Sequence, residues 1–127
     1  MRLFVPILAA AAIMSVTACN SSDATSPSVS IAGTWNLRTL NGSPLPYQVA
    51  PNTVIVSETL TLSSDGSYND VASYSNGTSF SEFGYFSVNN NLVTFNDQTD
   101  GITYTGAISG NVLTEVSGQF TSVYQKD

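Results

Sequence analysis

The sequence contains no histidine, a single cysteine and only three basic residues. Without histidine, the usual general base, the Ser-His and Cys-His nucleophile systems and most zinc sites are excluded. A single cysteine excludes an intramolecular disulfide. Nine carboxylates against so few cations leave no means of neutralising phosphates, which excludes binding to nucleic acid and to anionic lipid headgroups. We therefore expect no catalytic residues, no metal site and no cofactor, and we do not expect an enzyme.

Residues 1–18 have the pattern of a secretion signal. Arg2 is a short positive region, and the apolar run after it is about 14 residues long, whereas a membrane-spanning helix needs about 20. Val16-Thr17-Ala18-Cys19 resembles a bacterial lipobox. The resemblance implies cleavage between Ala18 and Cys19 and attachment of lipid to the cysteine thiol. The alternative is an ordinary signal peptide cleaved near Ala18, which would leave Cys19 as a free thiol.

The chain after the signal divides into a tether and one domain. Residues 19–30 are small and polar and show no apolar periodicity, which is typical of a flexible tether. Residues 31–127 show no second boundary and are long enough for one domain. We expect a lipoprotein of the bacterial cell envelope, anchored to the outer membrane or facing the periplasm, whose contact with the membrane is the N-terminal lipid. No motif indicates a protein partner.

The domain reads as short strands separated by turns, with no helical period. Asp65-Gly66 and Asn76-Gly77 predict hairpins of type I′, in which both central residues have positive φ. Residues 41–52 contain three prolines, which should prevent regular pairing. The predicted strands are 32–40, 54–63, 67–75, 78–88, 92–96, 102–109, 112–117 and 120–126. Serial hairpins predict an all-β, eight-stranded antiparallel up-and-down barrel, in which closure removes exposed edges. The alternative is a two-sheet β-sandwich.

Gly33-Thr34-Trp35 at the start of the first strand resembles the G-x-W signature of lipocalins. The pattern of residues 31–127 is also similar to the lipocalin-like domains of bacterial lipoproteins. This resemblance implies that Trp35 plugs the closed end of the barrel and that a basic residue packs over its ring, for which Lys126 is the candidate. It also implies a site for a small apolar or amphipathic molecule. The strands are short, however, and a filled barrel with a structural or protein-interaction role is the alternative.

Two acidic residues are candidates for a ligand site inside the barrel. Strict alternation places Glu58 on the same inner face as Val54, Val56, Leu60 and Leu62, and it places Glu82 with Phe80 and Phe86. A β-bulge or a position at the barrel mouth would expose either carboxylate instead. Two inward acids could contact a cationic or hydroxylated ligand or perform acid–base chemistry. Tyr85 and Tyr104 are candidate ligand contacts because tyrosine offers an apolar face and a polar tip.

The predicted lipid anchor depends on one thiol. Cys19→Ser should abolish lipidation and leave precursor or soluble protein, because no other cysteine can accept the lipid. Metabolic labelling with a fatty acid, followed by membrane fractionation, measures both effects. Unchanged labelling of the Cys19→Ser protein would contradict the lipobox interpretation.

Overall fold

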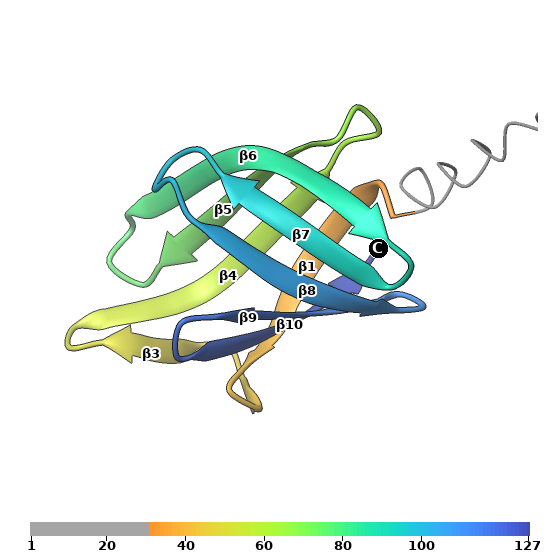
Figure 1. Ribbon diagram of the computed structural model, residues 1–127. Coiled ribbons are helices and arrows are strands. Elements are labelled where there is room, and N and C mark those ends of the chain that lie inside the picture. Colours follow the sequence, from red (N-terminus) through yellow and green to blue (C-terminus); the bar gives the residue numbers. More distant parts are fainter. Residues whose placement is uncertain (1–30) are drawn as a thin grey trace, which may run out of the picture.

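Every regular element in residues 31–127, the part of the chain that the structure describes, is a β-strand (Figure 1). The signal and tether predictions, including those for Ala18 and Cys19, lie outside these residues. The computed structural model has strands β1 (Gly33–Leu40), β2 (Ser43–Pro44), β3 (Tyr47–Ala50), β4 (Thr53–Leu62), β5 (Ser67–Tyr74), β6 (Ser79–Asn89), β7 (Leu92–Asp97), β8 (Thr103–Ser109), β9 (Val112–Ser117) and β10 (Phe120–Lys126). This part of the chain has no helix of the length and apolarity needed to cross a membrane.

Eight of the strands form a closed antiparallel up-and-down barrel. Each strand from β4 to β10 pairs with the next along the chain, and β1 then pairs with β10 on one side and with β4 on the other. The β1–β4 ladder is what closes the sheet, with Trp35 opposite Leu60. The predicted all-β barrel is therefore confirmed, and the alternative sandwich is not what forms.

The proline-containing connection is more regular than the sequence suggested. Within residues 41–52, β2 pairs with the end of β1, and β3 pairs with the start of β4. Pro44 lies in the two-residue strand β2, which pairs only with β1, so the missing N–H of proline interrupts no further ladder. The prediction that these residues form an unpaired loop is wrong for this reason.

The two predicted hairpin turns exist, but their type differs from the prediction. Gly66 and Gly77 have positive φ, 88° and 86°, whereas Asp65 and Asn76 do not. The Asp65 carboxylate instead accepts hydrogen bonds from the backbone N–H and the hydroxyl of Ser67. The side-chain oxygen of Asn76 accepts the equivalent two hydrogen bonds, from the backbone N–H and the hydroxyl of the threonine two positions after it. Side-chain bonding of this kind fixes the turn with only the glycine in the left-handed region.

Large apolar side chains fill the end of the barrel where β1 begins. Trp35 is fully buried, its indole N–H donates to the Ile31 carbonyl at 2.9 Å, and the Lys126 ammonium lies 5.8 Å from the ring centroid. Gly33 has a φ of 141°, and a Cβ there would lie 2.8 Å from Lys126 Cε, so glycine suits both the backbone and the space. The other buried residues of this end include Leu60, Leu62, Tyr68, Val93, Phe95 and Leu113.

Replacing the buried indole should therefore destabilise the barrel strongly. Trp35→Ala should cost about 3–5 kcal/mol of unfolding free energy, because it leaves a large void and removes a buried hydrogen bond. Urea unfolding in the Cys19→Ser background measures the loss. Phe83→Ala is the control, since Phe83 is 56% exposed and should change stability by less than about 1 kcal/mol. Equal effects of the two substitutions would contradict the role of Trp35 in the core.

Candidate functional site

A β-bulge decides which side chains of β4 face the interior. The register of β4 against β5 shifts between Ile55 and Ser57, so that Ile55 is buried while Val56 is 41% exposed. The predicted inner position of Val56 is therefore wrong, because one extra residue reverses the alternation at that point. Glu58 follows the bulge and keeps the inner face that it shares with Leu60 and Leu62.

The half of the barrel away from Trp35 contains a cavity of about 300 Å³. Its apolar lining comes from Leu40, Val49, Ile55, Ile102 and Phe120. Its polar lining comes from Glu58, Asp70, Glu82, Glu115, Tyr74, Tyr104, Tyr124, Ser117 and Ser122. A smaller hollow of about 130 Å³ shares Glu58, Asp70 and Glu82 with it. One end of the barrel interior is therefore solid, and the other is hollow and acidic.

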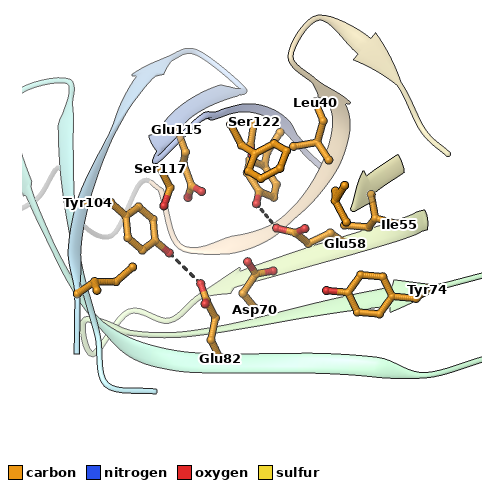
Figure 2. A pocket seen from close by; sticks show the side chains of 14 residues that line it. Leu40, Ile55, Glu58, Asp70, Tyr74, Glu82, Tyr104, Glu115, Ser117 and Ser122 are labelled. Atoms are coloured by element: carbon orange, nitrogen blue, oxygen red, sulfur yellow. Dashed lines mark hydrogen bonds between the residues drawn. The ribbon is translucent and has the colours of Figure 1, made fainter. Parts of the chain in front are cut away.

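The four carboxylates reach the cavity from four strands and face the same space (Figure 2). Glu58 comes from β4, Asp70 from β5, Glu82 from β6 and Glu115 from β9. Asp70 and Glu82 are direct cross-strand partners. Like charges in such a position repel each other, so the sheet places these acids together at a cost in stability.

Tyrosine hydroxyls satisfy two of the four carboxylates. The Tyr124 hydroxyl donates to Glu58 Oε1, and the Tyr104 hydroxyl donates to Glu82 Oε1 at 3.1 Å. The Tyr104 ring is held by stacking on Phe95, with ring centroids 5.0 Å apart. Burial raises the pKa of both tyrosines, so their hydroxyls remain donors at neutral pH.

The other two carboxylates are buried with an oxygen unpaired. Asp70 is 8% exposed and Glu115 is 5% exposed. Asp70 Oδ1 and Glu115 Oε1 have no hydrogen-bond partner within residues 31–127. A buried polar atom without a partner costs roughly 1–3 kcal/mol, and more when it is charged. The cavity therefore contains two carboxyl oxygens that the described chain leaves without a hydrogen-bond partner.

Burial and mutual repulsion hold protons on these acids. Burial raises the pKa of Asp70, and the nearby Glu58 carboxylate raises it further. Burial raises the pKa of Glu115 to about 8, with Glu58 and Glu82 adding to the shift. Burial is also the main reason that the pKa of Glu82 is raised. At neutral pH the raised pKa values of Asp70 and Glu115 thus keep these two carboxyl groups largely protonated.

No basic side chain lines this cavity in the described chain. Arg38 is exposed on β1, and Lys126 lies at the opposite end of the barrel over Trp35. These are the two basic residues of residues 31–127, and both lie away from the four acids of the cavity. The electrostatic character of the site is therefore strongly negative whenever its carboxyl groups ionise.

The structure brings most of the predicted site residues into two groups. Glu58, Glu82 and Tyr104 line the cavity, and Gly33, Trp35 and Lys126 meet at the solid end. Tyr85 belongs to neither group. It is 57% exposed because it alternates with the inward positions of Glu82, Gly84 and Phe86 on β6. The prediction of Tyr85 as a ligand contact is therefore corrected.

Sequence reasoning missed Asp70, Glu115 and Tyr124. Asp70 lies within the predicted strand 67–75, where it alternates with Tyr68 and Ala72 on β5 and therefore faces inward. Glu115 alternates in the same way with Leu113 on β9. A search for acids inside alternating apolar patterns would have found both. The contact of Tyr124 with Glu58 could not be predicted from the local pattern of β10, because it depends on the β1–β4 pairing that closes the barrel.

Another acidic group lies at the end of β7. Carboxylate oxygens of Glu82, Asp97 and Asp100 lie within 4.8 Å of one another, close enough to hold a metal ion. The Asp97 carboxylate, however, accepts the backbone N–H groups of Thr99 at 2.7 Å and Asp100 at 3.3 Å. These contacts account for the position of Asp97 as a loop-closing residue, so the arrangement does not by itself indicate a metal centre.

Comparison with known proteins supports the fold. No family model matches the chain, and no curated protein matches it by sequence. The chain is similar to the crystal structure of an uncharacterized protein from Bacteroides eggerthii DSM 20697, with a TM-score of 0.50 and 12% identity. That similarity covers 76% of this chain and 98% of the other. At this identity the likeness shows the fold alone.

The raised pKa values predict that the protein becomes less stable as pH rises. The unfolded chain releases the Glu115 proton near pH 4.5, whereas the folded chain holds it to about 8, so higher pH favours unfolding across that window. Each such group contributes a slope of about 1.4 kcal/mol per pH unit. Asp70 on β5 and Glu82 on β6 act in the same direction, facing Glu58, Tyr104 and Tyr124.

Glu115→Gln should remove one share of this dependence and stabilise the protein at pH 8 by roughly 1–3 kcal/mol. Urea unfolding at a series of pH values measures it. The control is Asp65→Asn, which changes an exposed turn acid whose pKa is lowered, so its contribution is constant above about pH 5. Parallel curves for the parent and Glu115→Gln would show that Glu115 is ionised in the folded protein.

Proposed function

We propose that this protein is a lipid-anchored lipoprotein of the bacterial envelope whose lipocalin-like barrel binds a small amphipathic molecule and catalyses no reaction. The observation that carries this proposal is the cavity of about 300 Å³, which is at the lower end of the size range of small-molecule sites. The site combines an apolar lining with a few convergent polar groups, which is the usual composition of ligand pockets.

The alternative of a filled barrel loses its main support. A filled interior would need apolar side chains from end to end, as at the Trp35 end. The other half instead has acids at inner positions of four strands, and these cannot pack as a dry core at low cost. A sequence that places polar groups in a cavity and leaves oxygens unpaired there is better explained by binding than by packing.

Two further observations support the lipocalin-like and lipoprotein parts of the proposal. The lipocalin resemblance implies a basic residue over the tryptophan of the G-x-W motif, and Lys126 lies 5.8 Å from the Trp35 ring centroid. The lipoprotein assignment depends on Val16-Thr17-Ala18-Cys19 in the sequence. The described chain begins at the solid end of the barrel, so a lipid at Cys19 would be joined to the end opposite the cavity.

Blocking the cavity should weaken ligand binding without unfolding the protein. Suitable probes are two matched amine and alcohol pairs, phenethylamine with phenethyl alcohol and octylamine with octanol. At least one probe should bind the parent, and Ser117→Trp should weaken that binding by about tenfold or more, because Ser117 lines the cavity. Isothermal titration calorimetry gives the affinities.

The matched control is Ser87→Trp, which adds the same side chain at an exposed position of β6. It should leave probe affinity unchanged. If no probe binds the folded parent, or if both tryptophan variants bind equally well, the cavity is not the binding site that we propose.

A further inference from the structure

Four acids of the cavity define the charge of its ligand. Resting on the proposed binding function, we infer that the barrel binds a small amphipathic amine, whose ammonium group is recognised by Glu58, Asp70, Glu82 and Glu115. This inference goes beyond the presence of a ligand site, because it specifies the sign of the charge and the groups that contact it.

The acids of the cavity have no basic partner among the residues that line it. Four carboxylates converge on one cavity, and no arginine or lysine of the described chain lines it. Removing a carboxylate from water is costly, and without a cation the raised pKa values of Asp70 and Glu115 keep these two groups protonated. A cation that enters with the ligand would compensate the charge that appears when they release their protons.

Two carboxyl oxygens of the cavity are available to a ligand. Tyrosine hydroxyls occupy Glu58 Oε1 and Glu82 Oε1. Asp70 Oδ1 and Glu115 Oε1, both on side chains more than nine-tenths buried, have no partner within residues 31–127. Figure 2 shows both carboxyl groups directed into the same space. An ammonium group has three N–H donors and no acceptor, so it complements these oxygens once the two carboxyl groups have released their protons.

The spacing of the acids distinguishes an organic cation from a metal ion. In residues 31–127, the three acids whose oxygens come within 4.8 Å of one another are Glu82, Asp97 and Asp100. Only one of these belongs to the cavity quartet. The carboxylates of Glu58, Asp70 and Glu115 therefore surround a space rather than a point, which fits a ligand with its own volume.

The cavity also has an apolar lining. Tyr74, Tyr104 and Phe120 present aromatic rings around the acids, together with aliphatic side chains such as Ile55. Aromatic faces attract cations and also bury apolar groups. An amine with an aryl or alkyl tail matches both parts of the lining, whereas a strongly hydrated inorganic ion matches only the acids.

The same matched probes test this inference in the intact fold, using the Cys19→Ser chain. Each amine should bind at least about tenfold more tightly than its alcohol, because the alcohol lacks the charge. Asp70→Asn and Glu115→Gln should each reduce amine affinity by roughly ten- to hundredfold, since each replaces a potential carboxylate with an amide of the same shape. Alcohol affinity should change by less than about twofold.

Asp65→Asn is the matched control, because it removes one carboxylate from an exposed turn outside the cavity. It should leave amine affinity unchanged. Thermal unfolding of every variant confirms that the comparison is made on folded protein, and the two isosteric cavity variants serve as independent tests.

The outcomes separate the inference from the proposed function. If alcohols bind as tightly as amines, the inferred charge is wrong and the binding function stands. If no probe binds, both fail. If calcium alone binds to the parent and is lost in Glu115→Gln, the cavity is a metal site and the inference is overturned. If amine preference survives both cavity variants, the amine is held elsewhere and the four acids are not its recognition groups.

Discussion

The pairing of β1 with both β10 and β4 is the constraint on which the rest of the structure depends. An open meander of these strands would have two unpaired edges and a face exposed to water. Closure converts the inner face into an enclosed space, so that every inward side chain must pack against others or line a cavity. Trp35 lies on the closing strand and contributes the largest buried side chain at its solid end.

The barrel interior is divided along its axis into regions of opposite character. Large apolar residues such as Trp35 and Phe95 supply hydrophobic stabilisation at one end. At the other end, Asp70 and Glu115 oppose folding whenever they lose their protons, because their charges are buried beside other acids. Burial of the apolar side chains at the first end offsets this opposition. The site therefore draws on the stability of the solid end without sharing residues with it.

Much of the fold could be predicted from the sequence, because alternation and turn residues are local signals. Trp35, Glu82 and Tyr104 were assigned correctly to the interior because their strands have no bulge at those positions. Val56 was assigned wrongly because a bulge depends on contacts between strands rather than on local alternation. Asp70 and Glu115 were missed because acidic residues near turns are usually solvated. Glu58 and Asp70 lie on adjacent strands of one hairpin, whereas Glu115 on β9 reaches them only because the barrel closes, which no local pattern specifies.

The ends of the described chain lie together at the solid end of the barrel (Figure 1). Trp35 pairs with Lys126, and the Asp127 backbone N–H donates to the Thr34 carbonyl at 3.0 Å. The cavity lies at the other end, where its lining includes Val49 of β3 and Ile102 of the connection between β7 and β8. The two ends of the barrel therefore differ: the termini of the described residues meet at the end that apolar side chains fill, and the acidic cavity lies at the opposite end.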